Sequence, residues 1–450
     1  MSTTDIIGYA VSALGGVALF LYGMNVLGNG LEKTSGGKME KILEKLTGNI
    51  VKAVILGAAV TAVIQSSSAT TVIVVGLVNS GILPLSSAVG IIMGANIGTT
   101  VTGQILRLGD LEGNESLGAA MEFLTPDYLA PILAIIGILI VLAAKKDSIR
   151  AIGDIGMGLG VLFTGMNLLS DSVKPLSELS AFKDLFASLE NPVLGIIAGA
   201  LVTALIQSSS ASVGILQAVS DTGLLSFAAA FPIIMGQNIG TCSTSVISSI
   251  GASKNAKRAA MVHLYFNVIG TVLFLISVYI IKALDFIPMW NSIMNRGDIA
   301  NFHTLFNIVV TIFFIPFHKV LEKLAIMTIR SKPEDEDEIS VDSGENMLDS
   351  RFLKSPSLAI QYANNAASYM GKLARENFKM SCGLLVSYDA KHVEKIREYE
   401  EIIDRTEDRL NSYLVSITDC ELSVVESRSV TSLLHIITDF ERIADYAFNI

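Results

Sequence analysis

Charged residues are scarce in this chain. Only 16% of its 450 residues are Asp, Glu, Lys or Arg, whereas a typical soluble domain has about 25%. No charged side chain occurs between Ala53 and Leu106, and Asp221 is the only one between Asn191 and Ser253. Apolar runs of this length are stable in a lipid bilayer or at the centre of a helical bundle. Residues 1–330 are therefore predicted to form an all-α polytopic membrane domain.

Cysteines are also few. Cys242, Cys382 and Cys420 lack the spacing of metal ligands, so structural thiols are the expected role. The N-terminus has no basic segment followed by a cleavage site, so no removable signal peptide is expected. The serine-rich segments described next have no His, Asp or Lys nearby, which disfavours an enzyme that needs a nucleophile and its base.

One part of the chain is present twice. At an offset of 142 residues, 65–68 and 207–210 both read QSSS, and 96–99 and 238–241 both read NIGT. About half of the positions from Asn49 to Thr100 are identical across this offset, without gaps. The period is far longer than that of solenoids or propellers. Each copy is therefore predicted to be one multi-helix half of a transporter built from internal repeats.

Equivalent loops of the two copies carry opposite charge. Segment 31–52 has five lysines against three glutamates, whereas its equivalent, 173–192, has two lysines against three acids. Segment 107–127 has one arginine and five acids, whereas its equivalent, ASKNAKRAA, has three basic residues and no acid. Since basic loops remain in the cytoplasm, the two copies are predicted to be inverted repeats. The same rule predicts a multi-pass protein of the cell inner (plasma) membrane, with the N-terminus outside and the C-terminal domain in the cytoplasm.

Each QSSS motif interrupts an apolar run. The run before Gln65 has about fifteen residues and the run after Ser68 about ten, whereas a membrane span needs roughly 20. Two short helices that meet at a polar tip, forming a re-entrant hairpin, fit these lengths. Backbone that leaves a helix at membrane depth faces protein or a water-filled site. The alternative is that these serines only pack helices and bond across them.

Residues 53–106 and 191–253, which contain the two QSSS motifs, have neither Lys nor Arg, so an anion bound there would have no fixed countercharge. Dehydrating a multivalent oxyanion in that setting is costly unless a cation accompanies it. Serine and glutamine oxygens, without thiolates or histidines, suit an alkali cation. The residues therefore indicate a cation-coupled anion carrier rather than an enzyme, with no organic cofactor and no nucleic-acid partner.

With these motifs, residues 8–320 resemble the type II sodium-dependent phosphate cotransporter family. The resemblance implies that Na⁺ and inorganic phosphate bind between the two QSSS hairpins and cross the bilayer by alternating access. The predicted phosphate ligands are Gln65, Ser66, Ser67, Ser68, Asn96, Gln207, Ser208, Ser209, Ser210 and Asn238. The predicted sodium ligands are Thr61, Thr99, Thr102, Thr203, Thr241 and Thr244, together with Gln207 and Ser208.

One motif departs from the family. Electrogenic members have an Asp in a His-Asp-Phe-Phe-Asn segment, and the corresponding stretch here, AAMEFLTPDYLA, lacks it. Related HLYFN and HTLFN segments occur at 263–267 and 303–307, where the two histidines are expected to pack and bond across helices. The coupling ratio is therefore left open.

The last part of the chain has soluble composition. Residues 331–355 are acidic and are predicted to be a linker, which leaves 1–150 and 151–330 as the two membrane repeats, the second with two further helices. Residues 356–450 have amphipathic helical spacing and resemble PhoU-type domains, with the pattern ending at Ile450 as if truncated. In such domains Glu-x-x-x-Asp pairs share a metal, and Glu400/Asp404 and Glu441/Asp445 match this spacing. Solvated helix charges are the alternative.

Two other functions remain open at this stage. The chain is either a carrier of another tetrahedral oxyanion, such as sulfate or arsenate, or a membrane-anchored phosphate-signalling scaffold that acts through its PhoU-like tail. A homodimer and a cytoplasmic phosphate-signalling partner are possible for each reading.

Overall fold

The computed structural model describes residues 2–35, 49–79, 83–108, 126–330, 348–420, 422 and 424–450. These residues form helices and no β-strand beyond an isolated bridge between Ser226 and Ile293. The chain divides into two compact units, Met1–Val78 with Leu83–Arg330 and Asn79–Ile82 with Ser331–Ile450. The all-α fold predicted from the sequence is confirmed. Much of the loops used for the charge argument, and most of the predicted acidic linker, lie outside the described residues.

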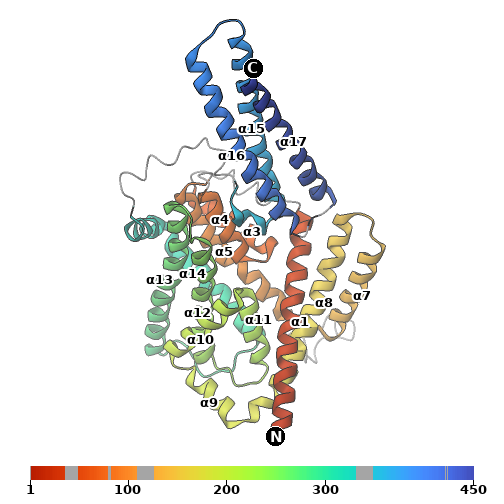
Figure 1. Ribbon diagram of the computed structural model, residues 1–450. Coiled ribbons are helices and arrows are strands. Elements are labelled where there is room, and N and C mark those ends of the chain that lie inside the picture. Colours follow the sequence, from red (N-terminus) through yellow and green to blue (C-terminus); the bar gives the residue numbers. More distant parts are fainter. Residues whose placement is uncertain are drawn as a thin grey trace. The chain divides into compact units, whose positions relative to one another are not determined.

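The first unit contains both copies of the repeat (Figure 1). The first copy comprises α1 (Thr3–Ser35), α3 (Ile50–Ile64), α4 (Ser67–Asn79), α5 (Leu85–Leu106) and α7 (Pro126–Ala143). The second comprises α8 (Asp147–Val173), the short η2 (Pro175–Glu178) and α9 (Ser180–Ser188), α10 (Pro192–Ile206), α11 (Ser209–Ser220) and α12 (Phe227–Ser248). Two long helices, α13 (Lys254–Ala283) and α14 (Arg296–Thr328), complete the unit.

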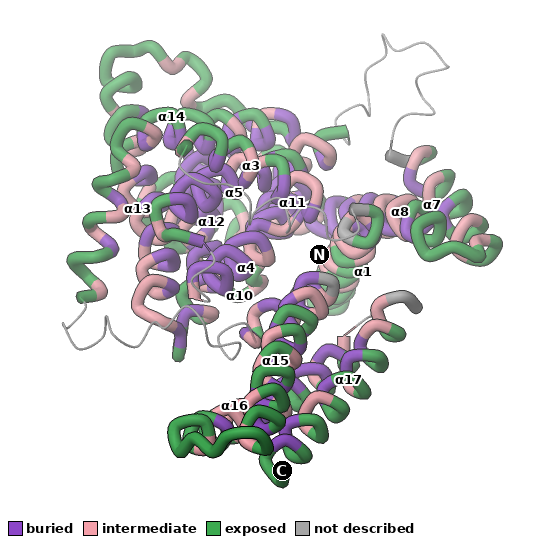
Figure 2. Tube along the Cα trace, turned by 90° about the horizontal axis from the view of Figure 1, so that it is seen from above, coloured by how far each residue is buried: buried purple, intermediate pink, exposed green. Residues whose placement is uncertain are grey.

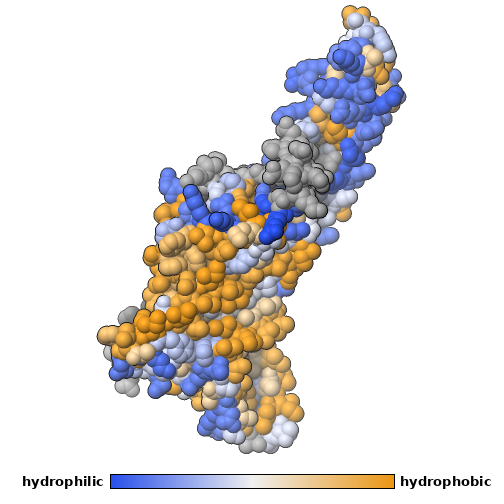
Figure 3. Space-filling model, turned by 90° about the vertical axis from the view of Figure 1, so that its left-hand side faces the viewer, coloured by the Kyte–Doolittle hydropathy of each residue, from blue (hydrophilic) through white to orange (hydrophobic). Residues whose placement is uncertain are grey.

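Five helices of the described residues are long and apolar enough to cross a membrane: Thr3–Leu31, Leu85–Leu106, Asp147–Glu178, Lys254–Ala283 and Arg296–Thr328. Helices α3, α4 and the part of α7 from Tyr128 are apolar but shorter, and α9 meets α10 at a bend of 103°. Segments 129–144 and 225–250 are largely helical but are not among the five. The face in Figure 3 shows a hydrophobic belt on this unit with hydrophilic residues at its ends. The chain is a multi-pass membrane protein.

Helices α1 and α8 pack against each other at glycines. A Cβ atom at Gly16 would lie 2.9 Å from the Gly165 carbonyl oxygen, and one at Gly23 would lie 2.8 Å from that of Gly158. Gly158 and Gly165 are the equivalents of Gly16 and Gly23 at the repeat offset, so one contact becomes the other when the copies are exchanged. Reciprocal contacts of this kind define a two-fold relation. Because the helices run antiparallel, the two copies are inverted.

The long helix of each copy packs on the first helix of its hairpin. A Cβ atom at Gly94 of α5 would lie 1.9 Å from the Val54 carbonyl oxygen of α3, and one at the equivalent Gly236 of α12 would lie 2.1 Å from that of Ile196 in α10. Backbone contact this close holds each helix pair as one body. Helices α5, α11 and α12 form the buried centre, while α1, α7 and α13 have broad exposed faces (Figure 2).

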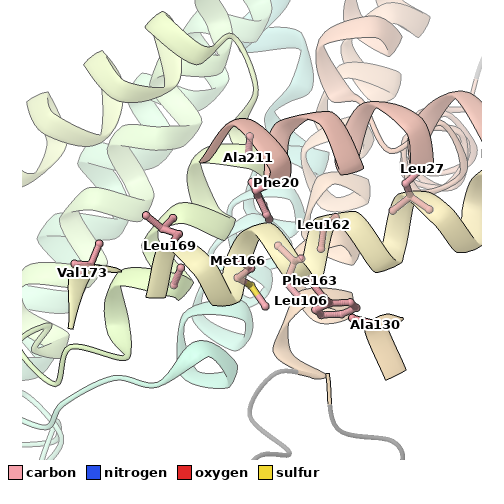
Figure 4. Packing of buried hydrophobic residues seen from close by; sticks show 11 residues of the cluster. Phe20, Leu27, Leu106, Ala130, Leu162, Phe163, Met166, Leu169, Val173 and Ala211 are labelled. Atoms are coloured by element: carbon pink, nitrogen blue, oxygen red, sulfur yellow. The ribbon is translucent and has the colours of Figure 1, made fainter. Parts of the chain in front are cut away.

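A hydrophobic core joins α1 and α8 to their neighbours (Figure 4). Phe20, Phe163 and Met166 are at most 1% exposed and lie between the two helices and residues of α5, α7 and α11. The interrupted hairpin of the second copy is thereby packed against the α1–α8 pair through Ala211 and Ala218.

The second unit is a small helical bundle. It consists of η5 (Ser350–Lys354), α15 (Pro356–Leu384), α16 (Ala390–Thr418) and α17 (Val424–Asn449). Phe352 stacks on Tyr362 with ring centroids 4.5 Å apart, and Ile403 and Leu410 are fully buried. The amphipathic spacing in the sequence thus corresponds to three packed helices.

The α1–α8 contact allows a direct test. Gly165→Val would place its Cβ 2.3 Å from the Phe20 amide nitrogen, so the helices must separate, and the free energy of unfolding should fall by at least ~1–3 kcal/mol. Gly15→Ala is the matched control, because nothing lies within 4 Å of its Cβ position, and it should raise stability by ~0.5–1 kcal/mol. Thermal melting of the purified protein in detergent measures both. Equal melting of the two variants would contradict this packing.

Candidate functional site

The backbone breaks at the same residue in each copy. Gln65 follows α3 with φ 58° and ψ 20°, and Gln207 follows α10 with φ 58° and ψ 23°. Their backbone amide groups donate to the backbone carbonyl oxygens of Thr61 and Thr203, both at 2.7 Å. This left-handed conformation costs an L-residue roughly 1–2 kcal/mol, and Asp285 is the only other non-glycine residue with positive φ in the described chain. The same left-handed residue therefore ends the first hairpin helix of each copy.

Two helix N-termini meet directly after these breaks. Helices α4 and α11 begin at Ser67 and Ser209, whose hydroxyl oxygens are 3.5 Å apart. Both serines are buried, with 3% and 2% exposure. Because they are equivalent residues, their contact lies on the pseudo-two-fold axis. Each helix N-terminus carries about half a positive charge, so two of them face one small region that contains no ionised side chain of either hairpin.

Hydroxyl pairs between the copies flank this point. Thr102 of α5 is 3.2 Å from the Ser210 hydroxyl, and the equivalent Thr244 of α12 is 3.2 Å from the Ser68 hydroxyl. Thr102 also lies 2.8 Å from Gln65 Oε1, and the Ser68 hydroxyl donates to the Gln207 carbonyl oxygen at 3.2 Å. Predicted phosphate ligands and predicted sodium ligands are therefore neighbours, each pair joining one copy to the other.

The remaining serines cap the helices. The hydroxyl oxygen of Ser66 accepts from the amide of Ala69 at 3.1 Å, and that of Ser208 accepts from the amide of Ala211 at 3.2 Å. A serine at this position satisfies one of the four amide groups that a helix N-terminus leaves unpaired. The amides left over remain donors for a ligand.

The two glutamines differ in exposure. Gln65 is 8% exposed and its side-chain amide donates to the Ala62 carbonyl oxygen, whereas Gln207 is exposed. The glutamine of the first hairpin tip is thus enclosed, whereas that of the second is not. This is a departure from two-fold symmetry in an otherwise symmetric arrangement.

Other predicted ligands have their bonds elsewhere. Asn96 donates to Asn267 Oδ1 of α13 at 2.9 Å, and Asn238 Oδ1 is 3.4 Å from His303 Nε2 of α14. The hydroxyls of Thr99 and Thr241 donate to carbonyl oxygens of their own helices, both at 3.0 Å. Thr61 donates to the hydroxyl of Thr70 at 3.1 Å. Thr203 Oγ1 has no partner among the described residues. Ligand roles for these six residues, and for the predicted ligands at the hairpin tips, remain predictions.

A buried ion pair behind the second hairpin was not anticipated from the sequence. Arg296, the first residue of α14, donates from Nε to both carboxylate oxygens of Asp221, at 3.2 and 3.1 Å. Ser170 of α8 also donates to this carboxylate. Gln217 Nε2 then joins the Gly103 and Arg296 carbonyl oxygens, at 3.1 and 2.9 Å. The signal was Asp221 itself, the only charge in a long apolar stretch, which needs a buried partner.

The carboxylates of the tail lie close together across α16 and α17. Burial, and next the carboxylate of Asp445, raise the pKa of Asp404 above its ordinary value. Burial and then Asp404 raise the pKa of Glu400, and burial and then Asp445 raise that of Glu441. Among the described residues no group of three or more His, Cys, Asp or Glu is arranged to hold a metal ion. Metal binding by the two pairs remains a prediction.

Comparison with known protein families finds a match for both parts of the chain. Residues 19–171, and again 164–287, match the Na⁺/Pi-cotransporter family. The chain belongs to this family. Residues 368–450 match the PhoU domain. The family resemblance seen in the sequence is confirmed for both parts, and the chain is a phosphate-transport protein rather than an enzyme. No solved structure matches it.

The chain is also similar in sequence to several known proteins. The chain is 25% identical over 434 residues to the putative inorganic phosphate export protein YjbB of Salmonella typhimurium, covering 96% of this chain and 75% of the relative. It is 30% identical over 317 residues to the uncharacterized protein YqeW of Bacillus subtilis, covering 70% and 97%. A stretch of 92 residues is 47% identical to sodium-dependent phosphate transport protein 2A of Rattus norvegicus, covering 19% and 14%.

The left-handed glutamine gives a prediction for stability. Gln207→Asn keeps a side-chain amide and introduces a residue that tolerates positive φ. Its free energy of unfolding should therefore stay within about 0.5 kcal/mol of the parent's. Gln207→Val forces a β-branched residue into this conformation and should cost roughly 1–3 kcal/mol. Since Gln207 is exposed, lost packing contributes little to either change. Thermal melting of both variants in detergent decides, and a valine variant as stable as the asparagine variant would contradict the strain.

The tail carboxylates give a pH prediction. Their raised pKa values mean that the folded tail binds protons more readily than the unfolded chain, so its stability falls as pH rises above the ordinary values of 3.8 and 4.5. Asp404→Asn should therefore increase hydrogen-exchange protection of α16 and α17 at pH 7, with a smaller gain at pH 5. Glu394→Gln, on the exposed surface of α16, is the control. A gain that is independent of pH would be evidence against mutual repulsion.

Proposed function

We propose that this protein carries inorganic phosphate across the membrane together with Na⁺, with both ions held between the QSSS segments and exchanged between the two sides by alternating access. The observation that carries this proposal is the meeting of two helix N-termini at Ser67 and Ser209, 3.5 Å apart and buried. The family match supports phosphate as the substrate.

Phosphate suits this point for electrostatic reasons. Unpaired amides at a helix N-terminus bind phosphate oxygens, and the helix dipole favours the negative charge. Two N-termini supply about one positive charge between them, and serine hydroxyls add further donors. This arrangement lacks a lysine or arginine, so it compensates only part of the charge of a divalent phosphate.

Sodium supplies the remaining charge in this proposal. The hairpin helices α3 and α10 end at the same breaks, and each C-terminus carries about half a negative charge. Oxygen atoms of Gln65, Thr102 and Thr244 lie beside the serines, and oxygen is the donor that alkali cations prefer. Cation and anion would then stabilise each other in a site of low polarity.

Alternating access follows from the two-fold arrangement of the copies. Each hairpin helix is packed on its long helix through glycine contacts, so α3 with α5 and α10 with α12 are suited to move as bodies. In transporters of inverted repeats, one copy rocks against the other around a central site. A state that is open to one side of the membrane requires the two copies to differ, and Gln65 is buried whereas Gln207 is exposed. In the state open to the other side, the two glutamines would exchange their environments.

The proposal is tested by labelled phosphate flux in proteoliposomes containing the full chain. Uptake should require an inward Na⁺ gradient and should not be supported by K⁺. Ser67→Ala combined with Ser209→Ala removes two donors at the helix ends, and should lower uptake at subsaturating phosphate by at least ~10-fold. Because the name of the Salmonella relative specifies export, efflux from loaded vesicles is measured in parallel.

Ser277→Ala is the control, since this α13 hydroxyl is exposed and donates only to its own helix at Leu273. It should transport at the parental rate. Phosphate flux that is equal in Na⁺ and K⁺, or a double serine variant with parental flux, would overturn the proposal. Flux of sulfate at the same rate as phosphate would assign a broader oxyanion specificity.

A further inference from the structure

Thr203 Oγ1, Ser212 Oγ and Gln237 Oε1 are buried oxygen atoms of the second copy without hydrogen-bond partners in the described chain, where Gln217 Oε1 and Ser243 Oγ are two others. The residues of the first three are 0%, 1% and 2% exposed and come from α10, α11 and α12. We refer to these three atoms as the oxygen cluster. Buried polar atoms without partners are rare in native proteins, and a group of three marks a place where a ligand completes the bonding.

The first copy shows what these positions do without a ligand. There Thr61 donates to the Thr70 hydroxyl at 3.1 Å, and Thr70 donates to the Ser66 carbonyl oxygen at 3.0 Å. Thr61 and Thr70 are the equivalents of Thr203 and Ser212. The equivalent of Gln237 is Ala95, which has no polar side chain. The first copy therefore satisfies its own hydroxyls.

Contacts of α12 place Gln237 beside Ser212 and Thr203 beside Gly240 in the second copy. Gln237 Nε2 donates to the Ser212 carbonyl oxygen at 3.0 Å, which places the amide group beside Ser212 and leaves Oε1 as its free acceptor. One turn along α12, a Cβ atom at Gly240 would lie 2.7 Å from Thr203 Cβ. The equivalent Gly98 has the same 2.7 Å relation to Thr61. Thr203 thus faces α11 and α12 as Thr61 faces α4 and α5.

Two substitutions explain the difference between the copies. Threonine is stiff at χ1 because its Cβ is branched, so the Thr70 hydroxyl is held against its own helix, where it accepts from Thr61. Serine at 212 lacks the methyl group that fixes this rotamer. Glutamine at 237 adds a carbonyl oxygen where the first copy has a methyl group. The first change leaves the hydroxyls of Thr203 and Ser212 unpaired, and the second adds one more oxygen atom.

We infer that the oxygen cluster binds one small monovalent cation, present in the second copy only. All three ligands are neutral oxygens, which suit Na⁺ better than a divalent ion that needs carboxylates. Thr203 lies in the last turn of α10, where the helix dipole is negative. The inference deepens the proposed Na⁺ coupling and rests on it for the identity of the cation. Of the three residues, only Thr203 was a predicted sodium ligand.

The test converts the second copy into the first. Ser212→Thr combined with Gln237→Ala restores the residues that close the cluster around Thr61. Thermal melting of the purified full chain is followed against NaCl without phosphate, with choline chloride keeping ionic strength constant. The parent should be stabilised by Na⁺ in a saturable way, and the double variant should need at least ~10-fold more Na⁺ for the same shift. In choline alone the two should melt together, or the variant higher.

Two further variants guard against a folding defect. Gln237→Met keeps the length of the side chain without its oxygen, and it should also raise the Na⁺ concentration at half-maximal shift. Thr164→Val is the control, because that hydroxyl donates to Gly160 of its own helix at 2.8 Å, and it should match the parent.

The outcomes separate this inference from the proposed function. No saturable Na⁺ shift in the parent, or equal shifts in the parent and both cluster variants, would mean that the cluster holds only water and would overturn the inference, whatever the phosphate flux. A Na⁺ shift that is lost in the variants supports the inference even if the parent carries no phosphate. Phosphate binding at saturating Na⁺, measured by filter binding, should persist in the double variant because Ser67 and Ser209 are untouched.

Discussion

The structure depends on two helix breaks inside an apolar protein. Stopping α3 at Gln65 and restarting at Ser67 leaves carbonyl and amide groups without intrahelical partners, and lipid offers them none. They must therefore be enclosed by protein and used. Two such breaks facing each other across a two-fold axis create a buried region of hydrogen-bond donors and acceptors with no net side-chain charge. A region of this kind suits a pair of opposite ions.

Close backbone packing keeps these breaks in place. Glycines let α5 and α12 lie against the hairpin helices and let α1 lie against α8, so the helices bring Thr102 and Thr244 to the serines of the opposite copy. Larger residues at these points would move the helices apart and lose the cross-copy hydroxyl pairs. The charged groups of the region are kept behind the site, where Arg296 and Asp221 neutralise each other.

Departures from the two-fold symmetry carry more information than the symmetry. Gln65 is buried whereas Gln207 is exposed, so the two hairpin tips differ in the exposure of the same residue. Thr70 and Ala95 close the first copy, whereas Ser212 and Gln237 leave free oxygens in the second. The second difference comes from two side-chain changes on a shared backbone, whereas Gln65 and Gln207 are the same residue in different surroundings.

The sequence by itself determined the helical membrane class, the duplication and the inverted relation of its copies, because apolar run length, repeat offset and loop charge are properties of the chain order. It also located both breaks, since the runs beside Gln65 and Gln207 are too short to span a bilayer. Which polar residues meet was decided only by the tertiary structure. Asn96 and Asn238 are predicted phosphate ligands together with the serines, yet they bond to α13 and α14, and Arg296 reaches Asp221 from 75 positions away. Contacts between distant segments depend on how helices rotate and pack, and a linear pattern does not contain that geometry.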